Sequence, residues 1–222
     1  MGHEGWDLSG VLIDMGGVLV SQRPDPAQIA QFLGLDQSVA DIAMVDQALW
    51  FHRQDYDEGL STEEFWYRVT GDCGIDVLTD EQIARLVELD VARQRNVEPD
   101  ALALVHHLRD QGLKVGMVAN APLPIALAVP TFPWARDSFD SLTFSSQVGA
   151  PKPSYRIYKQ ALADIGLPAD KVVMIDDRER HLRKADTMGM KTLQWREACQ
   201  VAGELADHGV VERDVLQPAP VS

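Results

Sequence analysis

Short apolar runs recur along the chain, and their length and spacing limit the architectures open to it. Four runs are clear and a fifth is weaker: Gly10–Asp14, Lys114–Ala119, Lys171–Asp176 and Lys191–Trp195, with Ser141–Phe144 as the weaker one. Each is too short for a helix, rich in Val, Ile, Leu or Met, and not alternating with polar residues. Such runs are typical of strands that are buried on both faces.

Helix-forming segments lie between these runs. Pro99–Gln111, Tyr155–Ile165 and Arg178–Met188 carry apolar residues at helical spacing, and each is followed directly by a glycine. Glycine after a periodic segment is a common helix stop. Because strands that alternate with helices form parallel sheets, we expect an α/β fold, a Rossmann-like parallel core with helices on both faces.

The alternation breaks after the first strand. Residues 24–95 contain helix signals only, in the segments Ala27–Leu33, Ser38–Arg53, Ser61–Thr70 and Thr79–Arg95. Two of these segments begin with capping-box patterns, at Ser61 and at Thr79. We therefore expect two units: an α/β core of residues 1–23 and 96–222, and an all-helical insert of residues 24–95. The terminal LQPAPVS is expected to be frayed.

The composition excludes several classes of partner. The 222 residues include 20 Lys and Arg against 34 Asp and Glu, a formal charge of −14, which repels nucleic acid and anionic membranes. No segment approaches the ~20 apolar residues of a membrane helix, and the first residues do not resemble a signal peptide. The two cysteines have no metal-like spacing. We expect a cytoplasmic protein, and a phosphorylated small molecule stays open as a ligand, because a metal ion and lysines reverse the charge locally.

Polar residues follow three of the strands, where open parallel sheets bind their ligands. Asp14 ends the first strand, Asn120 follows the second, and Asp176 and Asp177 end a later one, while Lys152 precedes the Tyr155 helix. Taken singly, each has an ordinary explanation as a helix cap, a turn residue or a solvated cation. Their occurrence together, in this order, indicates a functional site.

In these residues the chain resembles the haloacid dehalogenase superfamily, largely phosphatases and phosphotransferases with an aspartate nucleophile. VLIDMGGVLV is similar to the first motif of that family, GMVANA to the second, GAPKPSYRIY to the third and VVMIDDRERHLRKADTMGM to the fourth. The third and fourth matches are the most specific. The helical insert resembles the family's mobile cap of the four-helix type, through YDEGLSTEEFW.

The resemblance implies a role for each site residue. Asp14 attacks phosphorus and forms an acyl-phosphate. Mg²⁺ is held by a carboxylate oxygen of Asp14, the carbonyl of Gly16 and the carboxylate of Asp177, with Asp176 coordinating directly or through water. Lys152 neutralises the transferring phosphoryl group, and backbone N–H groups near Gly17 and Asn120 bind its oxygens.

Three positions depart from the family's pattern. Gly16 stands where phosphatases usually carry a second aspartate, the general acid and base, whose loss costs ~10²–10⁴-fold in rate. A branch of the family has glycine there and is nonetheless assigned to phosphatases. Ala119 replaces a hydroxyl residue that binds phosphate, and His181 replaces a frequent asparagine. His181 is either a substitute proton donor or, as we favour, a residue that orients or packs.

Three hypotheses follow. The first is a Mg²⁺-dependent phosphatase of a small phosphorylated metabolite, slowed by Gly16. The second is a catalytically impaired relative that binds a phosphorylated ligand or a protein partner. The third is a metal-free carbon–halogen hydrolase, against which the adjacent pair Asp176 and Asp177 argues, because two neighbouring carboxylates in a cleft need a cation.

Overall fold

The core of the protein is a five-stranded, fully parallel sheet in the strand order β3-β2-β1-β4-β5. The structure, a computed structural model, describes residues 5–20 and 24–212. The strands are β1 (Gly10–Ile13), β2 (Lys114–Ala119), β3 (Ser141–Phe144), β4 (Val172–Asp176) and β5 (Lys191–Gln194). All five predicted strands are therefore present, the weaker one included, each within one residue of its predicted bounds.

The register brings the carboxyl ends of the central strands together. In the centre of the sheet, Ile13 of β1 pairs with Met117 of β2 on one side and with Ile175 of β4 on the other. The chain then leaves the sheet within one to three residues of these pairs, at Asp14, Asn120 and Asp177. The polar residues predicted to meet thus start from neighbouring positions on one edge of the sheet.

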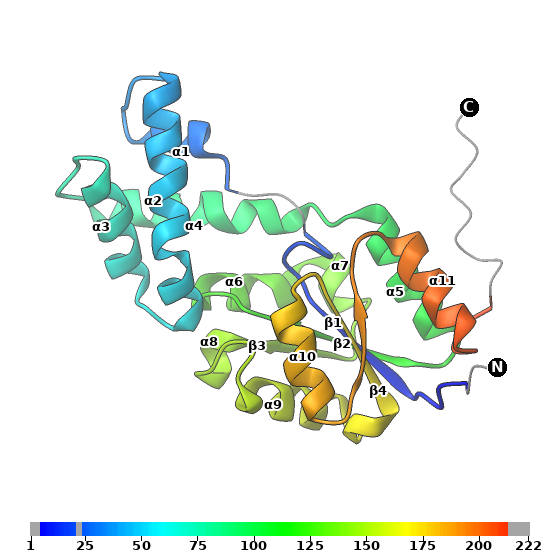
Figure 1. Ribbon diagram of the computed structural model, residues 1–222. Coiled ribbons are helices and arrows are strands. Elements are labelled where there is room, and N and C mark those ends of the chain that lie inside the picture. Colours follow the sequence, from blue (N-terminus) through cyan, green and yellow to red (C-terminus); the bar gives the residue numbers. More distant parts are fainter. Residues whose placement is uncertain (1–4, 21–23, 213–222) are drawn as a thin grey trace, which may run out of the picture.

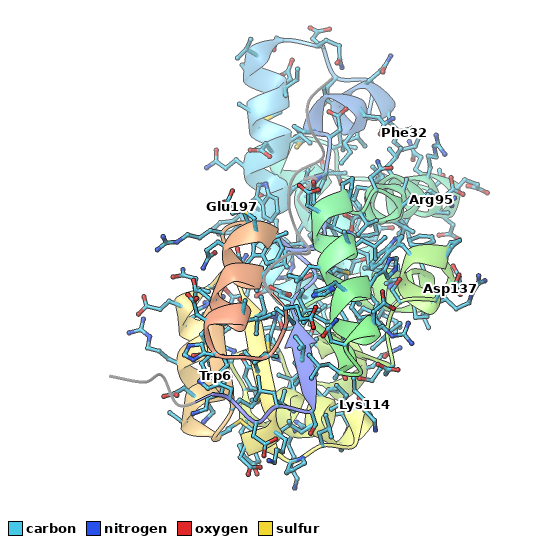
Figure 2. The ribbon with its side chains drawn as sticks, turned by 90° about the vertical axis from the view of Figure 1, so that its right-hand side faces the viewer. Trp6, Phe32, Arg95, Lys114, Asp137 and Glu197 are labelled. Atoms are coloured by element: carbon cyan, nitrogen blue, oxygen red, sulfur yellow. The ribbon has the colours of Figure 1, made fainter. Side chains whose placement is uncertain are left out.

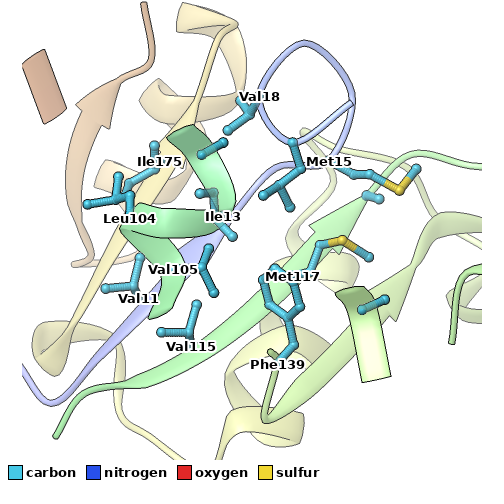
Figure 3. Packing of buried hydrophobic residues seen from close by; sticks show 14 of the residues in the cluster. Val11, Ile13, Met15, Val18, Leu104, Val105, Val115, Met117, Phe139 and Ile175 are labelled. Atoms are coloured by element: carbon cyan, nitrogen blue, oxygen red, sulfur yellow. The ribbon is translucent and has the colours of Figure 1, made fainter. Parts of the chain in front are cut away.

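Helices cover both faces of the sheet, as expected. On one face, Val11, Ile13 and Ile175 pack against Leu104 and Val105 of α5 (Pro99–Asp110), within a cluster that also includes α11 (Ala198–Asp207) (Figure 3). On the other face, Leu12 and Met174 pack within a cluster formed with α9 (Tyr155–Ile165) and α10 (Glu179–Thr187). Successive residues of β1 therefore point into two different apolar layers, which explains why this strand has no polar alternation.

Some elements were not predicted. They are α11 and the short helices α6 (Leu123–Ala128), α7 (Pro133–Arg136) and α8 (Ser145–Val148), together with the 3₁₀ turns Arg93–Arg95, Val129–Thr131 and Ala169–Lys171. The helices α6 to α8 have four to six residues each. Two turns or less give too few positions for a helical period to stand out in the sequence.

The insert is a unit of four helices with its own apolar core. These are α1 (Pro26–Phe32), α2 (Val39–Glu58), α3 (Thr62–Asp72) and α4 (Asp80–Ala92), and they bury Tyr56, Phe65 and Trp66 among them. Thr79 and Gln82 form the predicted capping box, and Ser61 caps α3. Helix α2 runs five residues beyond its predicted end and stops at Gly59, which has a φ of 116°.

The insert stands over the carboxyl ends of the strands. Helices α1 and α2 of the insert lie at one end of the molecule (Figure 1). Phe32 lies toward that end, and Lys114, the first residue of β2, lies at the other (Figure 2). None of the helices in the described ranges combines the length and the apolar character needed to cross a lipid bilayer. The terminal LQPAPVS lies outside the described residues, as do residues 21–23 at the predicted boundary of the insert.

Candidate active site

Lys152 joins two carboxylates at the carboxyl edge of the sheet. Its Nζ lies 2.7 Å from Oδ1 of Asp14 and 2.8 Å from Oδ2 of Asp176. The lysine comes from the loop between α8 and α9, whereas the two aspartates follow and end neighbouring strands. All three residues are at most 5% exposed. The sheet therefore brings together three of the residues that the sequence predicts for the site.

Asn120 holds the backbone of Lys152. Its Nδ2 donates to the Lys152 carbonyl at 3.1 Å, and its Oδ1 accepts the Lys152 N–H at 2.7 Å. Both polar groups of the amide are thus used to anchor the loop. The side chain of Asn120 consequently acts on the site through Lys152. The predicted contact between its backbone N–H and a phosphate oxygen stays a prediction.

Asp176 has a full set of hydrogen-bond partners. The N–H of Arg178 donates to Oδ1 at 2.9 Å, and His181 Nδ1 lies 2.9 and 3.0 Å from the two carboxylate oxygens. His181 is 2% exposed, and its Nε2 is buried without a hydrogen-bond partner. The histidine therefore orients Asp176, which agrees with the orienting role favoured from the sequence.

Asp177 lies against the glycine pair of the first loop. A Cβ atom placed on Gly17 would lie 2.7 Å from Oδ2 of Asp177, and Gly17 has a φ of 81°. Oδ1 of Asp177 is buried and has no hydrogen-bond partner, and the nearest described cation, Nε of Arg178, is 3.9 Å away. A buried carboxylate oxygen without a partner is costly and points to a missing cation.

The N–H of Gly17 is not free for a ligand. It donates to the Val20 carbonyl at 2.9 Å, within a loop in which the N–H groups of Leu19 and Val20 both bind the Met15 carbonyl. The partner of this N–H in the structure is therefore the Val20 carbonyl and not the predicted phosphate oxygen. What Gly17 supplies is space for the Asp177 carboxylate.

The charges of the site are unbalanced. Burial raises the pKa of Asp14 to about 7, against the attraction of Lys152, and the charges of Asp176 and Asp177 raise it further. Burial also acts on Asp176, but Lys152 and His181 outweigh it and hold the pKa of Asp176 well below its usual range. Burial and then the charge of Asp176 raise the pKa of Asp177. Three carboxylates share one ammonium group, so the site favours a further cation.

Among the described residues, the unpaired carboxylate oxygen of Asp177 fits a divalent cation better than the group of Asp14, Asp176 and His181 does. Ligand atoms of Asp14, Asp176 and His181 lie within 4.8 Å of one another, but the ammonium of Lys152 bonds to both of these aspartates and already neutralises that group. Both hydrogen bonds to the Asp14 carboxylate, from Lys152 and from the Met15 N–H, fall on Oδ1. The unpaired Oδ1 of Asp177 remains for a metal ion, and carboxylate oxygens are the ligands that Mg²⁺ prefers. Oδ2 of Asp14 receives no hydrogen bond from the described residues.

One residue that connects this site with the insert was not predicted. Ser145 is fully buried at the start of α8, and its hydroxyl bonds to Asp57 of α2 and to Ala121, next to Asn120. A serine after a strand has no distinctive pattern in the sequence. Its partners lie 24 and 88 residues away along the chain, so only the fold reveals them.

Known proteins resemble this chain over most of its length. A family model described as haloacid dehalogenase-like hydrolase matches residues 8–183. Hexitol phosphatase B of Escherichia coli K12 is 30% identical over 75% of this chain and 73% of its own. A sesquiterpene phosphatase of Aspergillus oryzae is 24% identical over 87% of this chain and 93% of its own. An enzyme of the same family from Bacteroides thetaiotaomicron, solved with magnesium and inorganic phosphate, superposes with a TM-score of 0.62 at 21% identity, covering 86% of this chain and 95% of that one.

Proposed function

The chain belongs to the haloacid dehalogenase-like hydrolase family, and we propose that it is a Mg²⁺-dependent phosphatase of a small phosphorylated metabolite, with Asp14 as the nucleophile. One observation carries the proposal: Lys152 lies within 2.8 Å of both Asp14 and Asp176, while Oδ2 of Asp14 receives no hydrogen bond from the described residues. The nucleophile is thus oriented through one oxygen and left available through the other.

Asp14, Lys152 and His181 have different roles in the first step. Asp14 attacks phosphorus through Oδ2 while the bond from phosphorus to the ester oxygen breaks, which gives an acyl-phosphate and the product alcohol, whose oxygen takes its proton from water. A water molecule then hydrolyses the acyl-phosphate to inorganic phosphate, so that one hard displacement is split into two easier ones. Lys152, held by Asn120 and Asp176, places positive charge beside the nucleophile and the transferring phosphoryl group. His181 holds Asp176 in turn, so the lysine keeps its position as charge moves.

We assign the metal to Asp14, the carbonyl of Gly16 and Asp177. The oxygens of Asp176 are already bound by Lys152, by the N–H of Arg178 and by His181. Asp176 therefore contributes through Lys152 or through a water molecule rather than by direct contact. Bound Mg²⁺ would offset the repulsion between the Asp14 carboxylate and the phosphate. The magnesium and phosphate bound by the Bacteroides enzyme support magnesium as the ion.

Both steps lack the usual general acid and base. Gly16 has no side chain to protonate the leaving oxygen or to activate water, and a Cβ atom there would meet no atom within 4 Å. We expect slow turnover, fastest for substrates whose leaving groups need no proton. The hexitol and sesquiterpene phosphatases among the relatives support a phosphorylated metabolite as substrate. The insert of residues 24–95 serves as the cap that selects it.

Two observations favour a second candidate, an impaired relative that binds a phosphorylated ligand without turning it over. Gly16 lacks the acid, and Ala119, which is 1% exposed, offers no hydroxyl to phosphate. This candidate predicts Mg²⁺-dependent phosphate binding with no release of product. A metal-free carbon–halogen hydrolase fits less well, because the unpaired oxygen of Asp177 would then stay without a cation.

The test is a screen of phosphorylated metabolites for phosphate release, with Mg²⁺ and with a chelator, beside the variant Asp14→Asn. We expect release that needs Mg²⁺ and that Asp14→Asn abolishes. Release that survives the substitution contradicts the proposal, since the activity then has another origin. Binding of a phosphorylated compound without release of phosphate would support the impaired relative. Release of halide at a rate that a chelator does not change would support the carbon–halogen hydrolase.

A further inference from the structure

Ser145 bonds the helical insert to the core through one short hydrogen bond. Its Oγ donates to the carbonyl of Asp57 at 2.6 Å and accepts the N–H of Ala121 at 2.9 Å. The Ala121 carbonyl is a second, more distant acceptor at 3.3 Å. Because a hydroxyl carries one proton, the shorter contact identifies Asp57 as its acceptor. Ser145 is fully buried, so no water competes for this proton.

The end of α2 provides a carbonyl that needs such a donor. The last carbonyls of a helix have no partner within the helix. At the end of α2, the N–H of Gly59 binds the carbonyl of Tyr56 and the N–H of Leu60 binds that of Asp55. The Asp57 carbonyl is bound by Ser145 instead. The insert therefore completes its longest helix with a hydroxyl from the core.

The same hydroxyl is connected to the catalytic lysine. Ala121, whose N–H it accepts, follows Asn120, and Asn120 makes both hydrogen bonds to the backbone of Lys152. Lys152 in turn contacts Asp14 and Asp176. If the insert moves away, Ser145 loses its acceptor, and the remaining protein acceptor within reach is the Ala121 carbonyl at 3.3 Å, in the segment that carries Asn120.

We propose that Ser145 is a positioning residue, which docks the insert on the core and holds the Asn120–Lys152 pair in place when the insert is docked. The kinetic part of this inference rests on the phosphatase function proposed above. The docking part does not, because it concerns hydrogen bonds that exist without substrate.

Ser146 is a matched control. Its hydroxyl is adjacent in sequence and buried, but has no hydrogen-bond partner. Ser146→Ala therefore removes a buried hydroxyl without removing a contact to the insert. Ser145→Thr keeps the donor and serves as the conservative rescue. Thermal unfolding of each variant shows that it is folded.

The first readout is amide hydrogen exchange in peptides that cover the end of α2 and residues 119–123, with the β4 peptide as internal reference. In Ser145→Ala we expect faster exchange in both peptides and no change in β4, whereas Ser146→Ala and Ser145→Thr stay close to the wild type. Wild-type exchange in Ser145→Ala overturns the docking role. This readout holds even if no substrate is turned over.

The second readout is the split between kcat and KM for the best phosphorylated substrate of the screen. Loss of one hydrogen bond of this kind is expected to lower kcat by about 3- to 10-fold. KM should change little, because Ser145 acts on the position of Lys152 and touches no substrate. A fall in kcat that Ser145→Thr restores supports the positioning role. Equal values of kcat in Ser145→Ala and Ser146→Ala overturn it.

Discussion

The carboxylate of Asp177 occupies the space that a side chain at Gly17 would need, because a Cβ atom on Gly17 would lie 2.7 Å from Oδ2 of Asp177. Gly17 also has a φ of 81°, a conformation that other residues rarely adopt. At Gly16 a Cβ atom would meet no atom within 4 Å. The two adjacent glycines are therefore there for different reasons: Gly17 is required by space and by its backbone conformation, whereas a side chain would fit at Gly16, where we propose that a general acid is missing.

Replacing the two glycines by alanine should separate these reasons. Gly17→Ala forces an unfavourable φ, which costs about 1–2 kcal/mol, and displaces Asp177. We expect a lower midpoint of thermal unfolding and weaker Mg²⁺ binding in calorimetric titrations. Gly16→Ala should leave both quantities close to the wild type. Unchanged Mg²⁺ affinity in a folded Gly17→Ala variant would argue against Asp177 as a metal ligand.

Restoring the missing acid should accelerate the enzyme. The space beside Gly16 admits an aspartate, and general acid–base catalysis contributes ~10²–10⁴-fold in rate. We expect Gly16→Asp to raise kcat most for alkyl phosphates, whose leaving oxygen needs a proton, and least for aryl phosphates. Gly16→Ala is the control. An equal gain on both classes of substrate would mean that the new carboxylate does not act as the acid.

Removing the lysine should destabilise the protein as well as inactivate it. Lys152→Met leaves Asp14 and Asp176 buried without their shared cation, and breaking a buried pair in this way costs about 3–5 kcal/mol. Urea unfolding at neutral pH measures the loss. Lys159→Met, on the exposed face of α9, is the control. The added change Asp14→Asn should recover part of the stability, since it removes one of the stranded charges.

The insert should contribute its own pH dependence of stability. Burial raises the pKa of Asp57 from 3.8 to about 6, against the attraction of Arg53. Between about pH 4 and pH 6 the folded state then binds more protons than the unfolded state, so the free energy of unfolding falls as the pH rises through that window. Asp57→Asn should flatten this slope.

Urea unfolding at several values from pH 4 to pH 7 gives the slope. Asp55→Asn, at an aspartate with a 59% exposed side chain on the same helix, is the control. If both variants keep the wild-type slope, Asp57 is not the residue that titrates in this window.

The sequence alone was sufficient for most of the fold, because the features that carry it are local. Strand β2 and helix α9 have their predicted bounds, since a buried apolar run and a helical stripe with a glycine stop act over neighbouring residues. The short helices α6 to α8 were not predicted, because they have too few residues to show a helical period of apolar residues in the sequence.

The same difference between local features and long-range contacts applies to the site. The sequence by itself placed Asp14 and Asp176 together, because strand ends in a parallel sheet converge, and the resemblance to a known family added Lys152 from the loop before α9. Only the tertiary structure decided their partners: Asn120 holds a lysine 32 residues away, Gly17 gives its N–H to Val20, and Ser145 reaches Asp57 across 88 residues. Such contacts join segments that are far apart in the chain. Local periodicity and propensity carry no information about the distances between those segments.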